Sequence, residues 1–416
     1  MAVGQLSLDS VSRTSPAPTP VWREPGMPAL LLLTAAGFAG YAALLTVAPM
    51  WAVHGGADEA GAGLVNGVLL LATILTQPFV PRLLRRFGTG RVLAAGLILL
   101  GGPSLLHLIS DRLDWILALS ALRGLGFGIL TVTGSTAVAH LVAPNRHGSA
   151  IGAYGAAIAI PQVVLLPAGP WIADVAGFWV VFALGALSIL GAVAAPPLAR
   201  ALREQEAERT LLDELEGDSQ QATSAAPPQR LALRLARPTI LLLGATLAGG
   251  AVITFAPLMS SSPLVAAGGL VVLTALAAIS RWQMGTLADR YGMTRFLWPL
   301  VALTVVGLAL TAIAVGDPGD TRVVLFLVAM ALVGVAYGGL QNLTLLLALS
   351  VVGRREYGTA SAVWNVGFDA GMAIGAVLVG VLAAGFAFPT ALLVAAALSL
   401  ATLPFAFIGR ARRQAR

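Results

Sequence analysis

The chain has 416 residues, of which 57% are hydrophobic and only 11% charged, and its formal net charge is +6. Soluble domains carry charge on about a quarter of their residues, so this composition excludes an ordinary soluble protein. The 25 basic residues are all arginines scattered between apolar runs, which argues against a nucleic-acid-binding surface, and the absence of cysteine excludes disulfides and thiolate metal sites.

The first 26 residues form a polar segment rich in Pro, Ser and Thr. A signal peptide needs an apolar core followed by a small-residue cleavage site, and this segment has neither. We therefore predict an N-terminal tail at residues 1–26.

Long apolar runs follow one another through most of the remaining chain. About 20 apolar residues are enough for a helix to cross the hydrocarbon core, and in lipid the backbone polar groups must be satisfied within the segment. We therefore predict an all-α membrane protein with twelve spans in two pseudo-symmetric groups of six. The spans cover residues 28–51, 60–81, 91–110, 114–142, 149–173, 177–198, 237–257, 263–288, 295–315, 321–351, 358–385 and 387–409.

One long polar stretch, residues 199–236, separates the two groups of spans. It begins with an Arg- and Glu-rich piece and ends in Ser, Ala and Pro, so we interpret it as a tether. The predicted organisation is an N-terminal half at 27–198, this tether, a C-terminal half at 237–409 and a short tail at 410–416.

Arginine is divided unequally between alternate loops. Arg112 and Arg322 lie in one set of loops and Arg123 and Arg281 lie within spans, which leaves 21 of the 25 arginines in the tails and the other set of loops. Cytoplasmic loops of membrane proteins carry the excess of arginine. We therefore predict that both termini and the tether are cytoplasmic, in a multi-pass protein of the plasma (inner) membrane.

Two segments repeat at a shift of 204 residues. The stretch from Gln77 to Arg91 aligns without a gap with the stretch from Arg281 to Arg295, and both follow the second span of their group. Parallel repeats of this kind build one large class of transporters. The polar and glycine positions of the pair are Arg85, Arg86, Gly88 and Arg91 in the first copy, and Arg281, Gly285, Asp289, Arg290, Gly292 and Arg295 in the second.

The second copy reads GTLADRYGMTR from Gly285 to Arg295. It resembles the GxLADRxGxxR signature of the major facilitator superfamily, and the resemblance extends over nearly the whole chain. The resemblance implies a twelve-helix transporter in which these segments form a cytoplasmic gate. In the first copy Pro81 replaces the glycine and Arg85 replaces the aspartate, so we expect the gate to rest mainly on the second copy.

Spans 4 and 5 carry further partial likenesses to this family. Span 4 contains Arg123 near Gly124 and is similar to the family's RxxxG segment, which is associated with proton coupling, although Ser120 occupies the usual arginine position. A charged residue in a span faces the bundle interior, so Arg123 acts either in coupling or substrate binding, or as a structural donor to backbone carbonyls. Span 5 is rich in Gly and Pro like the antiporter signature, but packing and kinks explain that richness equally well.

Span 11 carries a polar stripe. Ser361, Asn365 and Asp369 recur at intervals of four and share one helix face, with Trp364 beside them. Asp369 is the only acidic residue deep within a span, roughly 16 Å from the cytoplasmic end at ~1.5 Å per residue. It is the candidate for proton binding, with Arg123 and Asn365 as further coupling residues. The alternative is a fixed ion pair with Arg281 or Arg123.

Span 10 adds uncharged groups that can hydrogen-bond a solute, namely Tyr337, Gln341 and Asn342. With Ser361 and Trp364 they form the predicted cavity.

Together these patterns favour a secondary active transporter rather than an enzyme. The resemblance is closest to drug and metabolite exporters, which implies efflux of a small organic molecule in exchange for protons by alternating access. The alternatives are a proton symporter that imports a sugar or organic acid and, from another class, a transporter-like sensor or assembly subunit. We expect no cofactor besides the proton gradient, no metal, no nucleic acid and no ATP, since a phosphate-binding loop needs a lysine. The expected partners are the solute and the lipid bilayer, and the expected state is a monomer.

Overall fold

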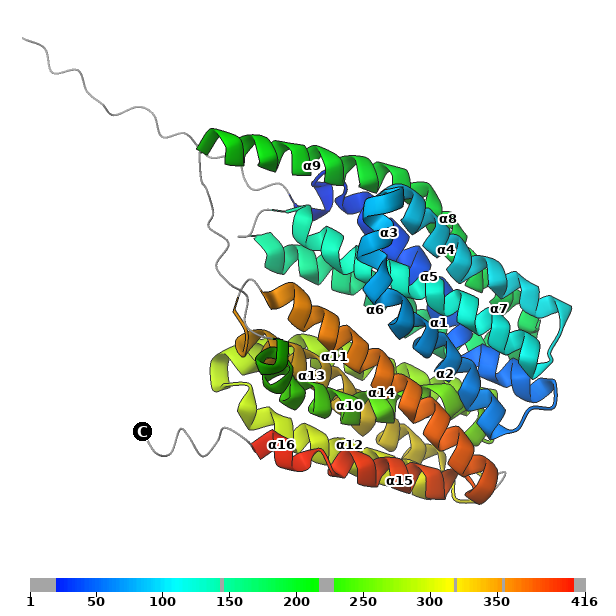
Figure 1. The fold of residues 1–416 in the computed structure, drawn as a ribbon. Helices are drawn as coiled ribbons and strands as arrows, with labels where there is room; N and C mark the ends of the chain where they lie inside the picture. Colours follow the sequence, from blue (N-terminus) through cyan, green and yellow to red (C-terminus); the bar gives the residue numbers. More distant parts are fainter. Residues whose placement is uncertain (1–19, 143–145, 217–227, 318–319, 354–355, 408–416) are drawn as a thin grey trace, which may run out of the picture.

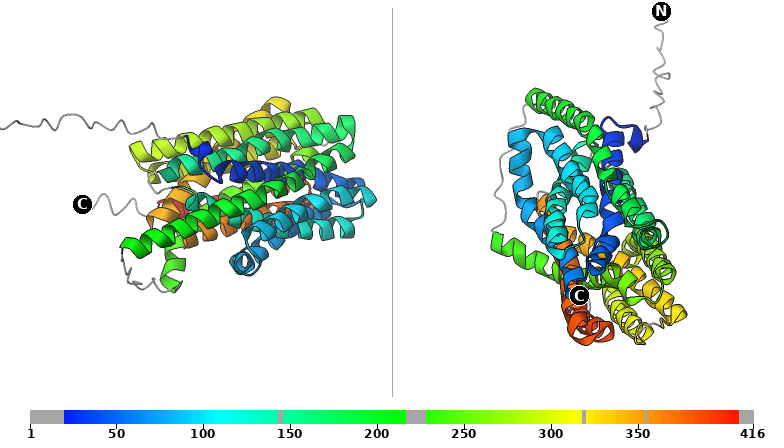
Figure 2. Two further views of the ribbon diagram at one scale, coloured as in Figure 1. Left: turned by 90° about the horizontal axis from the view of Figure 1, so that it is seen from above. Right: turned by 90° about the vertical axis from the view of Figure 1, so that its right-hand side faces the viewer.

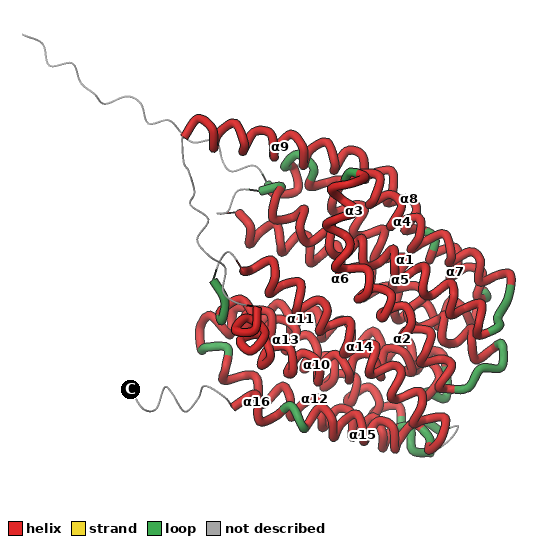
Figure 3. The backbone as a smooth tube through the Cα atoms, viewed as in Figure 1, coloured by secondary structure: helices red, strands yellow, loops and turns green. Residues whose placement is uncertain are grey.

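The computed structural model describes residues 20–142, 146–216, 228–317, 320–353 and 356–407. Within these ranges every regular element is a helix (Figure 3). Most of the predicted N-terminal tail, the centre of the predicted tether (217–227) and the predicted tail 410–416 lie outside the described residues.

The helices fall into two successive groups. The first comprises η1 (Val21–Arg23), α1 (Met27–His54), α2 (Glu59–Thr76), η2 (Gln77–Phe79), α3 (Val80–Phe87), α4 (Thr89–Leu106), η3 (His107–Ile109), α5 (Leu113–His140), α6 (His147–Ala176), α7 (Phe178–Gly185), α8 (Leu187–Gly191), η5 (Ala192–Ala194) and α9 (Ala195–Glu216). The second comprises α10 (Pro228–Met259), α11 (Pro263–Tyr291), α12 (Thr294–Ala314), α13 (Val323–Ser350), α14 (Tyr357–Phe386), α15 (Phe388–Leu400) and α16 (Leu403–Phe407).

Twelve helical stretches in the described residues are long and apolar enough to cross a membrane, which confirms the predicted number of spans. Several extend further than predicted, most of all the second, which covers Glu59–Phe87, the sixth, Phe178–Glu208, and the seventh, Leu231–Met259. Helix α9 continues to Glu216, through the beginning of the predicted tether. An apolar run shows which residues lie in the lipid. Ala, Leu, Arg and Glu favour a helix both inside and outside the membrane, so a helix can continue beyond its apolar run.

The repeated segments end their helices in the same way. Helix α3 ends at Gly88 with φ +82°, and helix α11 ends at Gly292 with φ +84°. Positive φ is accessible to glycine because it has no Cβ. The repeat found in the sequence therefore corresponds to one structural feature, the end of the second long helix in each half.

Successive long helices run in opposite directions, so the connections lie at two faces of the bundle (Figure 1). We call the face at which α1 begins and α16 ends the terminal face. The opposite face, which carries the connection between α1 and α2, is the distal face.

The two halves pack against each other along two pairs of helices, α2 with α14 and α6 with α11. Seen from the right-hand side of Figure 1, the blue and cyan helices lie above the yellow and red ones (Figure 2). In Figure 1 the two halves lie close together at the distal face and diverge toward the terminal face. A site between the halves is therefore bordered by helices from both.

Candidate functional site

Asp369 lies near the middle of α14 and is only 5% exposed. Its Oδ2 atom accepts a hydrogen bond of 2.8 Å from Nε2 of Gln77 in η2. Gln77 belongs to the first half and Asp369 to the second, so this bond joins the two halves within the membrane. Neither Arg123 nor Arg281 forms an ion pair with Asp369 among the described residues.

Two buried tyrosines, one from each half, lie within electrostatic range of Asp369. They are Tyr41 on α1 and Tyr337 on α13. The Tyr41 ring stacks on Phe127 with the ring centroids 4.0 Å apart, and the Tyr337 hydroxyl donates to the sulfur of Met372 at 3.4 Å. The carboxyl group thus lies among polar aromatic groups rather than beside a cation.

Arg123 is 1% exposed, and its hydrogen bonds among the described residues lie within the first half. Its Nη2 donates to the carbonyl of Gly40 at 3.2 Å and its Nε to the carbonyl of Leu100 at 3.4 Å. These bonds correspond to the structural alternative for this residue, a donor to backbone carbonyls that ties α1 and α4 to α5. Tyr41 lies within electrostatic range of both Arg123 and Asp369.

The polar groups predicted on span 10 surround Arg281. Nη1 of Arg281 donates to Oε1 of Gln341 at 3.2 Å, and Nδ2 of Asn342 donates to the carbonyl oxygen of Arg281 at 2.9 Å. Oδ1 of Asn342 is buried without a hydrogen-bond partner in the described part of the chain. Gln341, which is buried, and Asn342, which is partly exposed, therefore hold this cation in place.

The remaining residues of the polar stripe differ in their surroundings. Trp364 is buried, its Nε1 donates to Thr344 Oγ1 at 3.1 Å, and its ring stacks on Phe368 with centroids 5.7 Å apart. Ser361 and Asn365 are partly exposed. Their side chains form no hydrogen bond within the described ranges, so both are available to a solute.

The gate segments lie at the terminal face and are exposed. In the second copy Arg290 lies 5.3 Å from the Tyr291 ring centroid, and in the first Arg86 lies 5.2 Å from that of Phe87. Asp289 has no ion pair or hydrogen bond with any other described residue, and a side chain at Gly285 would meet only Asn342. The exposed gate residues are Asp289, Arg290, Arg295, Arg85, Arg86, Gly88 and Arg91.

The distal ends of α2 and α14 touch through their backbones. A Cβ added at Gly380 would lie 2.5 Å from the carbonyl oxygen of Glu59, and one added at Gly63 would collide with the carbonyl of Ala376. Nearby, Nδ2 of Asn66 donates to Leu45 O at 2.8 Å and to Thr254 Oγ1 of the second half at 2.9 Å. We call this contact the distal seal.

Glycines near the terminal face have no such neighbours. A Cβ added at Gly152 or Gly155 of α6, or at Gly358 of α14, would meet no atom within 4 Å. The backbone contacts at the distal face and the divergence of the halves in Figure 1 together indicate that the halves meet at the distal face and are apart at the terminal face.

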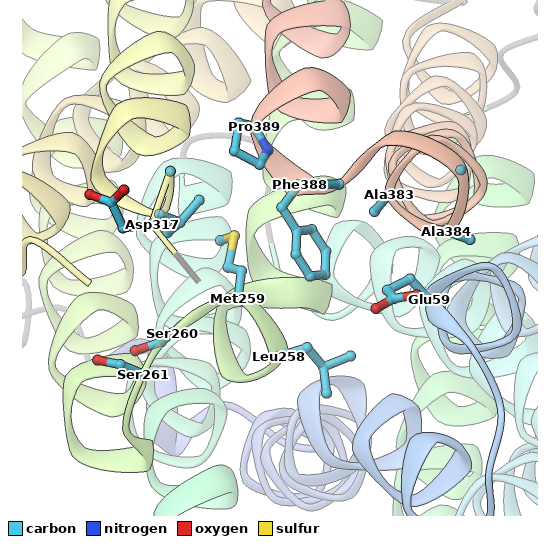
Figure 4. Close-up of a pocket in the computed structure, with 14 residues that line it drawn as sticks. Glu59, Leu258, Met259, Ser260, Ser261, Asp317, Ala383, Ala384, Phe388 and Pro389 are labelled. Carbon is cyan, nitrogen blue, oxygen red and sulfur yellow. The ribbon is translucent and has the colours of Figure 1, made fainter. Parts of the chain in front are cut away.

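A cavity of about 530 Å³ lies at the distal face. Figure 4 shows Met259 and Phe388 between the carboxyl groups of Glu59 and Asp317, which lie on opposite sides of the cavity. Ala387, also in its lining, has φ +81°. The distal seal lies between this cavity and Asp369, because along α14 the seal residues Ala376 and Gly380 come after Asp369 and before Ala383, which lines the cavity.

Sequence reasoning did not identify the partners Gln77, Tyr41, Asn66 and Thr254. Gln77 could have been recognised as a candidate site residue, since it is a polar residue in a span and aligns with Arg281 in the repeat. Asn66 carried a weaker one as an amide in the second span. Their partners lie in the other half of the chain, which no local pattern predicts.

Comparison with protein families gives one match. The profile of the Major Facilitator Superfamily matches residues 30–368 and, overlapping with these, 284–416. A search among curated proteins returned no match.

Several solved structures share the fold. A crystal structure of the nucleoside transporter NupG aligns with a TM-score of 0.65 and 14% identity, over 91% of this chain and 98% of that one. The peptide transporter POT in complex with sulfate aligns with a TM-score of 0.70 and 14% identity, over 94% and 95%. A POT family transporter in complex with 5-aminolevulinic acid gives 0.67 and 13%, over 92% and 95%. At such identities the likeness concerns the fold alone.

Proposed function

The chain belongs to the major facilitator superfamily and is a membrane transporter, and we propose that it couples the movement of a small organic molecule to protons by alternating access. Asp369 is the proposed proton-binding group. The proposal includes the plasma membrane as location, a cytoplasmic terminal face and a monomeric state. The arginine-rich loops at the terminal face support the orientation.

The hydrogen bond between Gln77 and Asp369 carries this proposal. An ionised carboxylate accepts hydrogen bonds roughly twice as strong as those of neutral acceptors. Binding a proton to Asp369 therefore weakens a contact between the two halves, at 2.8 Å, inside the membrane. Coupling a proton to alternating access needs such a link between the charge of one group and the separation of the halves.

Export in exchange for protons is the first candidate direction. It rests on the likeness to drug and metabolite exporters, and the partly exposed Ser361 and Asn365 supply uncharged contacts for such a cargo. Uptake together with protons is the second candidate. Its cargo would be a sugar or an organic acid, and one observation favours the acid: the partly exposed Arg281 has no acidic partner among the described residues.

Transport in inside-out vesicles with an imposed proton gradient and a panel of solutes tests the proposal. We expect Asp369→Asn to abolish gradient-driven transport while the protein still folds, because the amide is nearly isosteric but carries no proton. The matched control is Asp114→Asn, an exposed acid at the distal face, which should transport normally.

Two outcomes would count against the proposal. Full gradient-driven transport by Asp369→Asn would remove this residue from coupling. A folded wild-type protein that moves no solute of the panel under either gradient direction would favour the transporter-like sensor.

A further inference from the structure

Arg281 is a positively charged residue that has no role in the proton coupling proposed above. It lies in α11, ten residues before the end of the helix at Tyr291, which is about 15 Å at ~1.5 Å per residue. This depth removes it from the lipid headgroups. Its side chain is partly exposed, so a solute between the halves can reach it.

The charges within the spans do not balance. Away from the span ends the charged residues are Arg123, Arg281 and Asp369, two cations and one anion. Arg123 is 1% exposed and bonded to backbone carbonyls, so a solute cannot reach it. A charge in the membrane interior is costly unless it is paired. Arg281 therefore lies where a counter-charge stabilises the protein.

Most N–H donors of the Arg281 side chain form no hydrogen bond with the described residues. A guanidinium group has five N–H donors, and one hydrogen bond of 3.2 Å to the neutral oxygen of Gln341 is the only one its side chain makes within the described ranges. Asn342 holds the backbone of the same residue. Gln341 and Asn342 thus fix the position of the group and leave donors for a ligand that matches its planar fork.

An aromatic wall begins beside this cation. Tyr337 lies within electrostatic range of Arg281, its ring centroid is 6.2 Å from that of Phe368, and Phe368 stacks on Trp364. Rings of this kind contact planar or apolar bodies. The site therefore combines an unpaired cation with an apolar surface.

We propose that the cargo is a small organic acid whose carboxylate binds Arg281 and whose body lies against Phe368, the partly exposed ring of this group. This inference rests on the proposed transport function. Carboxylates fit a guanidinium group through two parallel hydrogen bonds, so the acid is recognised by shape as well as charge.

The location of Asp369 adds a consequence for coupling. Tyr337 lies between the two charged sites, because it is one turn before Gln341, the partner of Arg281, and its hydroxyl bonds to Met372, three residues after Asp369. The other groups facing Asp369 are Gln77 of η2 and Tyr41 of α1. Neither an amide nor a protonated tyrosine carries a charge. An ionised Asp369 repels a bound carboxylate and a protonated one does not. Proton and acid therefore promote each other's binding, which favours the second candidate, uptake together with protons, over exchange.

Thermal stability of the purified full-length protein with matched acids and amides provides the test. The probes are benzoate and 3-phenylpropionate, each against its own amide. We expect stabilisation by the carboxylates only, and a loss of apparent affinity of about tenfold or more in Arg281→Gln. Arg281→Lys should retain part of the affinity because it keeps the charge without the fork. Arg112→Gln, an exposed arginine at the distal face, should bind as the wild type does.

The pH dependence separates a binding role from a structural one. Carboxylate affinity should rise as the pH is lowered in the wild type and lose this dependence in Asp369→Asn. No carboxylate response, an equal response to amides, or equal affinity in Arg281→Gln and the wild type would overturn the inference. Gradient-driven transport of a neutral or cationic solute that survives Arg281→Gln would overturn it too, while leaving the transporter proposal intact.

Discussion

The distal seal depends on the absence of a side chain at Gly380. A Cβ at this position would lie 2.5 Å from Glu59 O and 3.0 Å from the Phe255 ring, whereas ordinary contact begins at 3.4 Å. In Gly380→Ala the two backbones must therefore separate by about 0.9 Å, the difference between the two distances to Glu59 O. The clash exists only while the halves meet at the distal face, so it acts on one conformation and not on the other.

The size of the effect follows from the cost of overpacking. One added methyl group in a well-packed contact costs about 1–3 kcal/mol. Because the cost falls on the distally closed conformation alone, the equilibrium should shift by about 5- to 150-fold toward the distally open one. Glu59 O is backbone and cannot rotate away, which favours the upper part of this range.

Cysteine accessibility measures this shift directly, since the chain has no native cysteine. A reporter cysteine at Val377, whose side chain lies against Gly67 of α2 in the seal, should be alkylated faster in Gly380→Ala by a membrane-impermeant maleimide added at the distal face. A second reporter at Thr359, exposed near the terminal face, should be alkylated more slowly. Gly385→Ala is the matched control, because a Cβ there meets no atom within 4 Å. Equal Val377→Cys rates in Gly380→Ala and the control would refute the argument.

The remaining predictions concern a strained turn and the topology. Ala387→Gly should raise the thermal stability of the protein, because φ +81° with ψ 158° is a conformation essentially restricted to glycine and costs about 1–3 kcal/mol. Gly177→Ala at the equivalent turn, with φ +91°, should lower the thermal stability. A change of stability in the same direction in both variants would contradict this account. Reporter fusions after Ala201 and Arg416 should both be cytoplasmic, and a periplasmic signal from either would contradict the orientation inferred from arginine.

Most of the fold could be predicted because the bilayer imposes it locally. A long apolar run must be a helix in lipid, so each span follows from its own residues. The helix ends could not be predicted in the same way, as α9 shows. It remains helical to Glu216 because its Ala, Leu, Arg and Glu residues favour a helix after the apolar run has ended. Hydropathy indicates where the lipid ends, whereas the helix itself continues until a residue such as Gly292 ends it.

The candidate site was predictable only one residue at a time. Asp369 stood out as the single acid deep in a span, but its partner Gln77 is 292 residues away in sequence, and their contact depends on how the two halves meet. Gln341 and Asn342 were predicted to face a solute, which stays a prediction, and no local pattern indicated that both bond to Arg281. A polar residue in a span indicates that a polar partner exists, and only the packing of helices shows which one.

The repeat explains why the link between the halves is asymmetric. Gln77 and Arg281 occupy the same position of their repeats, yet Gln77 reaches across to Asp369 and Arg281 bonds within its own half to Gln341. Helices α6 and α14 repeat at a shift of 210 residues, since Gly148-Ser149-Ala150 at the start of α6 matches Gly358-Thr359-Ala360 at the start of α14. Asp369 then corresponds to Ala159 on α6, which cannot accept a hydrogen bond through its side chain. The symmetric bond therefore cannot form between α6 and α11. The amide of Gln77, in the first copy of the repeat, makes the contact between the halves, and Arg281, in the second copy, keeps free N–H donors. A proton site and a separate anion site require this division of roles.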